Sequence, residues 1–215
     1  SASTKINSED IWEKNYAKKF LIAEEEIKKL CLELNITYTI LRPSMIWGNK
    51  RDLNITFIMK FIVNYGLLIL PSNGVGVRYP IHIEQLAESI LDIYQRKKVG
   101  LINILGPEKL KYKDMCKRIF RWYGYHPLIL IFPKYLKIFA VIFLKYIFRK
   151  PYINKSSFDR IDYSPSMQYG NPENYYSSGK FQPYKNDLLN KTIFASFIQK
   201  GFLSLKKLIF ISNKE

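Results

Sequence analysis

The sequence contains few of the residues that bind metals or form disulfides. Its 215 residues include two cysteines and two histidines, Cys31, Cys116, His82 and His126. These four are spread along the chain without the short spacing that a zinc site requires. Both cysteines lie within apolar helical patterns, so we interpret them as core thiols in a reducing compartment. The sequence therefore predicts no metal site.

A glycine-rich phosphate loop is also missing. The 10 glycines include no Gly-x-x-Gly-x-x-Gly run between a strand and a helix, the arrangement that binds the pyrophosphate of a dinucleotide. The closest pair, Gly74 and Gly76, lies in a turn that opens no helix. We therefore expect that this chain does not hold a dinucleotide on its own.

Acidic residues are scarce relative to basic ones. The chain has 18 Asp and Glu against 34 Lys and Arg, which gives a formal net charge of +16. Such a charge attracts partners that carry phosphate. The lysines, however, are dispersed among Ile, Asn and Phe and form no basic tract with interleaved aromatics, the pattern that favours nucleic-acid binding. We therefore predict no nucleic-acid partner.

Uninterrupted hydrophobic runs of membrane-spanning length are absent as well. The most apolar segment, Leu128–Phe148, has about the length of a span, which requires ~20 apolar residues. Pro133 and three lysines interrupt it, and a central lysine is costly in lipid. We expect a short strand followed by an amphipathic helix, buried in the protein or, as a second interpretation, lying on a membrane surface. The predicted location is cytoplasmic, with peripheral contact at the inner face of the membrane under that second interpretation.

The clearest elements are a long helix and the strand after it. Glu13–Leu34 has apolar residues at alternating steps of four and three, which predicts one buried stripe of a helix. The stripe consists of Tyr16, Phe20, Ala23, Ile27, Leu30 and Leu34. Tyr38–Leu41 reads as a buried parallel strand that ends before Pro43. Ligands of open α/β sheets bind at the carboxyl ends of such strands.

Several motifs follow one another along the chain. They are Ser1-Ala-Ser-Thr4, Ala23-Glu24, Thr37 to Gly48 with its Arg-Pro-x-x-x-Trp-Gly, Arg51-Asp-Leu-Asn54, Arg78 to Ala87, Asn103-Ile-Leu-Gly106 and Lys111 to Met115. In this order they resemble the extended short-chain dehydrogenases, the NAD-dependent nucleotide-sugar epimerase, dehydratase and reductase family. Trp47 stands where the family has Tyr, and Gln85 where it has Asp.

The resemblance implies an α/β fold, a partial Rossmann-like doubly wound parallel sheet with a small α+β substrate-binding lobe. Residues 1–105 would be the C-terminal part of the cofactor domain, with 49–83 contributing to the lobe. Residues 106–183 would form the lobe and 184–215 a terminal extension. Because the first residue is Ser1 rather than Met, and the family's glycine-rich loop has no counterpart, we expect an N-terminally truncated chain. A degraded coding sequence is the alternative.

The resemblance also implies a catalytic centre. In the family a Tyr moves a proton while hydride passes to the nicotinamide, and a Lys four residues later lowers the pKa of the phenol. Tyr16 stands at the position of that Tyr, but Phe20 stands at the position of the Lys. Lys19 is then the candidate cation, and Ser3 the candidate orienting hydroxyl, with Thr4 as its alternative. A core aromatic on the buried stripe is the other interpretation of Tyr16.

Binding roles follow from the same resemblance. Pro43 and Ser44 would border the nicotinamide ring of NAD or NADP. Arg78 would reach the diphosphate of a nucleotide-diphosphate sugar with its paired donors, unless it is an ordinary surface arginine. Asn54 would hydrogen-bond the nucleotide sugar or its phosphate, unless it is an ordinary loop residue.

The implied function of the complete protein is NAD(P)-dependent epimerisation, dehydration or 4-keto reduction of a nucleotide sugar in surface polysaccharide synthesis. A homodimer is a further expectation. The alternative is a catalytically degraded remnant of the same fold that only binds a ligand or a membrane, or an atypical reductase that binds NADP without turnover. Phe20 and Gln85 are the residues that favour degradation.

Overall fold

The computed structural model describes residues 11–131, 161–164 and 172–212. The chain divides into two compact units, which are described separately. The first comprises Ser1–Ile46, Gly76–Leu110 and Tyr163–Phe181, and the second Trp47–Val75, Lys111–Asp162 and Gln182–Glu215. The domain boundaries expected from the sequence stay a prediction.

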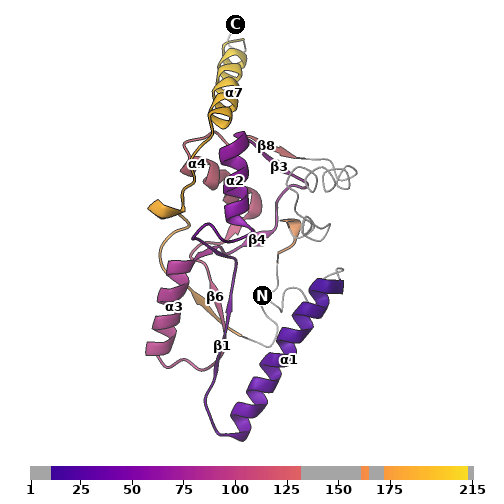
Figure 1. Cartoon of the computed structure of the whole chain (residues 1–215), viewed down its shortest axis with the longest axis vertical. Helices are drawn as coiled ribbons and strands as arrows, with labels where there is room; N and C mark the ends of the chain where they lie inside the picture. The colour runs from indigo at the N-terminus through magenta and orange to yellow at the C-terminus, as the bar shows by residue number, and fades with distance from the viewer. Residues whose placement is uncertain (1–10, 132–160, 165–171, 213–215) are drawn as a thin grey trace. The chain divides into compact units, whose positions relative to one another are not determined.

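Three parallel strands form the sheet of the first unit. β1 (Thr39–Pro43) pairs with β6 (Gly100–Leu105), and β6 pairs with β9 (Glu173–Tyr176) (Figure 1). A parallel connection needs a crossover segment, and the helix α3 (Ile83–Gln95) lies in the crossover from β1 to β6. A mixed α/β fold with a parallel sheet is the fold class that the sequence predicts, and it is confirmed.

Helix α3 covers one face of this sheet with apolar side chains. Its Ile93 lies in a buried cluster with Ile102 and Ile104 of β6, and Leu41 of β1 packs against the cluster. Full burial of such a side chain stabilises a fold by about 1.5–3 kcal/mol. Tyr175 of β9 also packs there, and its hydroxyl donates to Asp92 of α3 at 2.8 Å.

The opposite face of the sheet meets α1 (Ile11–Glu33). Successive residues of a strand point to opposite faces, and while Leu41 joins the cluster beside α3, Arg42 pairs with Glu24 of α1. Figure 1 shows α1 and α3 on either side of β1 and β6. The two helices therefore enclose the sheet in the doubly wound manner.

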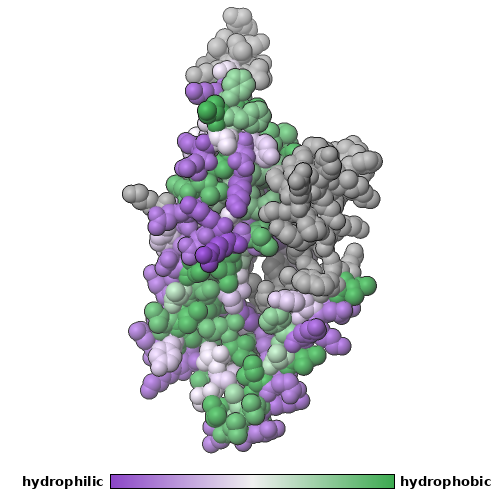
Figure 2. All heavy atoms as spheres, viewed as in Figure 1, coloured by the Kyte–Doolittle hydropathy of each residue, from purple (hydrophilic) through white to green (hydrophobic). Residues whose placement is uncertain are grey.

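The predicted buried stripe of α1 is wrong, although the helix itself is confirmed. Tyr16 is 45% exposed and Leu30 is 54% exposed, whereas Ala17 and Leu21 are buried. The buried side thus lies one residue further on, about 100° around the helix. The physical reason is Arg42, a buried cation on β1 that requires Glu24 to face the sheet. Figure 2 shows apolar and charged residues mixed over the exposed surface of α1.

The second unit contains most of the remaining elements that the structure describes. They are α2 (Ile55–Tyr65), β3 (Leu68–Leu70), α4 (Tyr112–Trp122), β8 (Ile129–Ile131), the 3₁₀ turn η3 (Lys185–Asp187) and α7 (Ile193–Ser212), with β3 and β8 parallel. Shorter strands along the chain are β2 (Ile46–Trp47), β4 (Val77–Arg78), β5 (Ile81–His82) and β7 (Leu110–Lys111).

Gly66 closes α2 in a way that requires glycine. Its φ of 67° is left-handed, and a Cβ there would lie 2.6 Å from the carbonyl oxygen of Ala195. The N-terminus of α7 therefore approaches the end of α2 too closely for a side chain. Thr192 completes this junction, because its hydroxyl donates to the carbonyls of Val63 and Asn64.

The segment Leu128–Phe148 is described only in part. Ile129–Ile131 form a strand, as expected for its beginning, and residues 132–148 lie outside the described residues. Within the helices that the structure describes, none combines the length and the apolar character needed to cross a bilayer.

Candidate functional site

Arg78 of β4 is held in place by backbone carbonyls. Its side chain is buried, with the residue 8% exposed, and Nη1 donates to the carbonyls of Val77 at 2.6 Å and of Tyr163 at 2.7 Å. Beside it, the hydroxyl of Ser164 accepts a hydrogen bond from the backbone N–H of Val77 at 2.9 Å. Carbonyl oxygens are neutral, so these contacts orient the guanidinium without neutralising its charge.

Tyr16 lies on the exposed side of α1, which excludes its interpretation as a core aromatic. Its ring lies 4.8 Å from the ring of Phe20, measured between centroids, in a tilted arrangement. Phe20, which stands where the family that the sequence resembles has Lys, therefore packs against the phenol ring. Lys19 is exposed and points from the adjacent side of the helix, one residue or about 100° before Phe20. Ser3 and Thr4 lie outside the described residues.

Ser44 joins three backbone segments at the carboxyl end of β1. Its hydroxyl donates to the carbonyl of Tyr79 and accepts from the N–H of Gly106 at 3.2 Å, while its own N–H donates to Ile104 at 2.9 Å. Gly106 must be glycine, because a Cβ there would lie 2.0 Å from the carbonyl oxygen of Pro80. The hydroxyl of Ser44 is thus hydrogen-bonded to the backbone. Any ligand here would be recognised by the shape of the surrounding backbone rather than by this hydroxyl.

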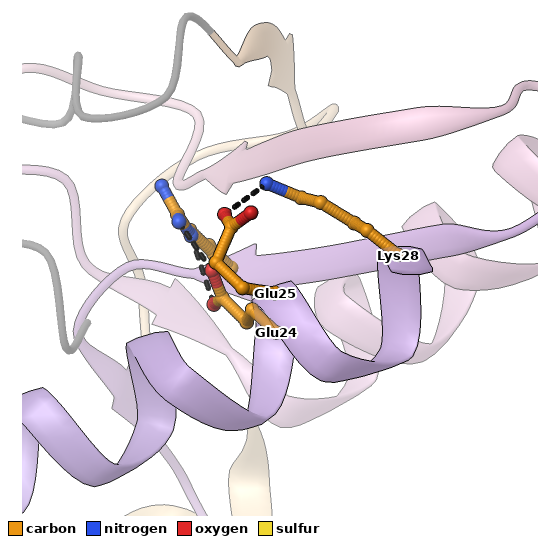
Figure 3. A network of polar contacts seen from close by, with 4 residues as sticks. Glu24, Glu25 and Lys28 are labelled. Carbon is orange, nitrogen blue, oxygen red and sulfur yellow. Dashed lines mark hydrogen bonds and ion pairs between the residues drawn. The ribbon is translucent and has the colours of Figure 1, made fainter. Parts of the chain in front are cut away.

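A buried ion pair connects α1 to the sheet, and sequence reasoning missed it. Arg42 Nε donates to Glu24 Oε1 at 3.0 Å, and Arg42 Nη2 contacts Glu24 Oε2 (Figure 3). The Arg42 side chain is 4% exposed and that of Glu24 14%. An arginine within an apolar strand was the available signal, since buried cations require an acidic partner.

Glu25, the neighbour of Glu24, forms a contrasting pair at the surface. Its carboxylate accepts from Lys28 at 2.6 Å within the same helix (Figure 3). The hydrogen bond and the positive charge of Lys28 lower the pKa of the Glu25 carboxyl. Exposed pairs of this kind contribute little to stability.

Gln85, close to His82, differs from the pattern of the family that the sequence resembles. His82 caps α3 through Nδ1, which accepts the N–H of Glu84 at 3.2 Å, and the His82 N–H donates to Gln85 Oε1 at 3.1 Å. Gln85 Nε2 donates to the carbonyls of Ser178 and Lys180, each at 3.2 Å. A carboxylate has no hydrogen to donate, so an Asp or Glu at this position could not make these two bonds. Gln85 is therefore well accommodated at its place in the fold.

Asn54 belongs to the second unit and precedes α2. Its side chain makes no capping hydrogen bond. The cap is Asp52, whose carboxylate accepts from the N–H of Asn54 at 3.1 Å and from the N–H and hydroxyl of Thr56 at 3.0 and 2.5 Å. Sequence reasoning overlooked Asp52, although Asp is among the preferred capping residues. The amide of Asn54 is exposed and is not used by the helix.

Two other residues singled out from the sequence are structural. Trp47 is 1% exposed and stacks on Trp122 with 5.3 Å between ring centroids. Cys116 is buried as predicted, and burial raises the pKa of its thiol. Cys31 is half-buried. No group of three or more metal-binding side chains occurs among the residues whose positions are described.

No protein-family model and no curated protein matches the sequence. Solved structures do match. UDP-glucuronic acid 4-epimerase from Bacillus cereus is 20% identical, with 68% of this chain and 52% of that chain covered and a TM-score of 0.46. UDP-glucose 4-epimerase from Thermus thermophilus is 12% identical, with 68% and 52% covered and a TM-score of 0.44.

A third match is the dTDP-glucose 4,6-dehydratase DesIV from Streptomyces venezuelae, 12% identical, with 67% of this chain and 48% of that chain covered and a TM-score of 0.43. The chain thus spans about half the length of these structures. Its own residues must carry any argument about function.

Proposed function

We propose that this chain is part of an enzyme that epimerises, dehydrates or reduces a nucleotide-diphosphate sugar with NAD or NADP. The observation that carries the proposal is Arg78, a buried guanidinium oriented by carbonyls at 2.6 and 2.7 Å. A preoriented guanidinium recognises phosphate oxygens through paired donors. Its position within a motif series of the correct order supports a diphosphate as its ligand.

The proposed chemistry centres on the phenol of Tyr16. An exposed phenol can exchange a proton with a sugar hydroxyl, and a nearby ammonium makes that exchange easier by stabilising the phenolate. Lys19 is the proposed source of this charge, with its flexible stem reaching toward Tyr16. Ser3 is proposed to orient the sugar hydroxyl, and Asn54 to hydrogen-bond the nucleotide.

The cofactor would be shared between this chain and further sequence. Pro43 and Ser44, at the carboxyl end of β1, are proposed to border the nicotinamide ring, which would accept and return the hydride. The sequence offers no glycine-rich loop for the pyrophosphate. We therefore propose that this chain contributes the nicotinamide end of a cofactor site.

The proposal extends to the biological setting. A role in surface polysaccharide synthesis, a cytoplasmic location and a homodimeric state are consistent with a nucleotide-sugar enzyme. Membrane contact through Leu128–Phe148 remains a separate proposal, because most of that segment lies outside the described residues.

A non-catalytic remnant of the same fold is the second candidate. The contact between Phe20 and Tyr16 favours it, because an apolar ring occupies the position where an ammonium would assist the phenol. Gln85 does not favour the remnant, since its two bonds to Ser178 and Lys180 preserve the local structure.

Turnover of a UDP-sugar distinguishes the two candidates. The protein is expressed with any coding sequence found in frame before Ser1 and assayed with NAD or NADP for product sugar and reduced nicotinamide. We expect Tyr16→Phe to lower kcat by about 100-fold or more, as for the loss of a general acid or base. Tyr94→Phe is the matched control, because Tyr94 is 80% exposed on α3. Absence of turnover in the wild type, with UDP-sugar binding retained, would favour the remnant.

A further inference from the structure

Among the residues that the structure describes, helix α1 buries few apolar side chains. Of its apolar side chains that the structure describes, Ala17 and Leu21 are buried, while Tyr16, Phe20 and Ile27 are each close to half exposed. Alanine contributes little area, so hydrophobic burial holds this helix weakly. A helix attached in this way needs another contact to fix its position.

On the face of the sheet that meets α1, one row of side chains across the three strands is polar. Arg42 of β1 lies opposite Asn103 of β6, and Asn103 lies opposite Asn174 of β9. Asn103 Nδ2 donates to Asn174 Oδ1 at 2.9 Å. Residues directly opposite in a parallel sheet share a face, and such faces are usually apolar. This polar row offers α1 hydrogen-bonding groups where it would otherwise find hydrophobic side chains.

Glu24 is the residue of α1 that contacts this polar row, through Arg42. Both of its oxygens contact the guanidinium of Arg42, from Nε and from Nη2. A contact through two atoms fixes the relative orientation of the two groups as well as their separation. Because both side chains are largely buried, removing one partner leaves the other charge buried without that contact.

We infer that the Glu24–Arg42 pair positions α1, and with it Tyr16 and Phe20. β1 is held independently by its pairing with β6 from Thr39 to Pro43, so the pair anchors the helix to a fixed strand. Tyr16 lies eight residues before Glu24, which is about 12 Å along the axis and about 80° around it. A change in the pair therefore moves the phenol. Glu24 and Arg42 are positioning residues, and their role in turnover rests on the proposed function of Tyr16.

Hydrogen exchange measured by mass spectrometry tests the positioning without an activity assay. In the expressed protein, Glu24→Gln should speed exchange of α1 amides between Ala17 and Leu30 by about 10- to 100-fold, with β6 amides unchanged. Arg42→Lys keeps the charge but loses the planar fork, so it should give a smaller increase. Glu26→Gln is the matched control, since Glu26 forms an exposed pair with Lys29 on the same helix and its loss should leave exchange unaltered.

Reversing both charges of the Glu24–Arg42 pair tests whether the contact between α1 and β1 can be restored. The double variant Glu24→Arg/Arg42→Glu should bring α1 exchange closer to the wild type than Glu24→Gln does. Unaltered α1 exchange in both Glu24→Gln and Arg42→Lys would overturn the inference. Equal acceleration in α1 and β6 would also overturn it, because the pair would then stabilise the whole unit. Arg42→Lys keeps the test usable if Glu24→Gln does not fold.

Enzyme activity distinguishes this inference from the proposed function. The assay uses the protein expressed with any coding sequence found in frame before Ser1, which we call the extended protein. Glu24→Gln should lower kcat with KM nearly unchanged, because it moves Tyr16 and leaves Arg78 in place, and the charge-reversed pair should restore part of kcat. Faster α1 exchange without any turnover in the wild type would support the positioning and refute the enzyme. Normal kcat in Glu24→Gln, despite loosened α1, would refute the link to Tyr16.

Discussion

The two helices of the first unit are attached to the same sheet by different forces. Helix α3 is held by the buried cluster around Ile93, Ile102 and Ile104, whereas α1 is held by a small apolar contact and the Glu24–Arg42 pair. Apolar burial is non-directional and proportional to area, while a bidentate ion pair fixes orientation. Apolar burial therefore holds α3, whereas a single polar contact sets the orientation of α1, which carries the candidate catalytic residue.

The largest expected effect is on the α3 side. Ile93→Ala removes a side chain that is 2% exposed, and we expect it to lower the free energy of unfolding by about 2–5 kcal/mol through lost burial and a cavity. Urea denaturation gives the measurement. Leu91→Ala on the same helix is the control, because Leu91 is 60% exposed and its loss should cost little. Equal costs for both variants would contradict the role of the cluster.

Removing both charges of the Glu24–Arg42 pair should lower the free energy of unfolding less than removing one of them. Arg42→Met alone leaves the Glu24 carboxylate buried without its partner and should cost about 3 kcal/mol of unfolding free energy. The double variant Arg42→Met/Glu24→Leu should cost less than the single one, because both charges are then gone. A double variant as unstable as the sum of the single variants would show that the two residues act independently.

The Gln85 contacts should have an intermediate effect confined to one segment. Gln85→Glu removes the donor shared by the carbonyls of Ser178 and Lys180, and we expect a loss of about 1–3 kcal/mol. Amide exchange of residues 177–181 should rise in parallel. Gln95→Glu, at the exposed end of α3, serves as the control. If Gln85→Glu behaves like that control, the accommodation of Gln85 is refuted.

The smallest expected effect is a pH dependence of stability that arises from Asp92 on α3. The hydrogen bond from Tyr175, followed by Arg96, lowers the pKa of Asp92 below its usual 3.8. A lowered folded-state pKa contributes stability that is present above the unfolded pKa and is lost as the pH falls through the folded one. We therefore expect the urea midpoint to fall less between about pH 6 and about pH 3 in Tyr175→Phe than in the wild type. Parallel curves for both proteins would exclude this contribution.

Local features of the fold were predictable from the sequence. The helix predicted at Glu13–Leu34 is α1, Ile11–Glu33, so its bounds agree within two residues at the start and one at the end. The strand expected at Tyr38–Leu41 is β1, Thr39–Pro43. Apolar periodicity and the turn residues that bound each segment determine these elements, and both are visible in a short stretch of sequence.

Features that depend on distant partners were not predictable in the same way. The buried side of α1 follows from Arg42 on another element, so its apolar spacing alone indicated the wrong face. From the sequence alone, Gln85 suggests a degraded protein. Its bonds to Ser178 and Lys180, 93 and 95 residues away, are visible only in the structure. The candidate binding role of Arg78 came from motif order, and its carbonyl contacts required the structure.

Titration of the extended protein with UDP-N-acetylglucosamine tests the central claim most directly. The account predicts saturable binding that Arg78→Lys weakens by about 10-fold, because lysine keeps the charge but loses the paired donors. Arg96→Lys, at the exposed end of α3, should bind as the wild type does. Equal affinity in Arg78→Lys and the wild type, or no binding by either, would contradict a nucleotide-sugar site at Arg78.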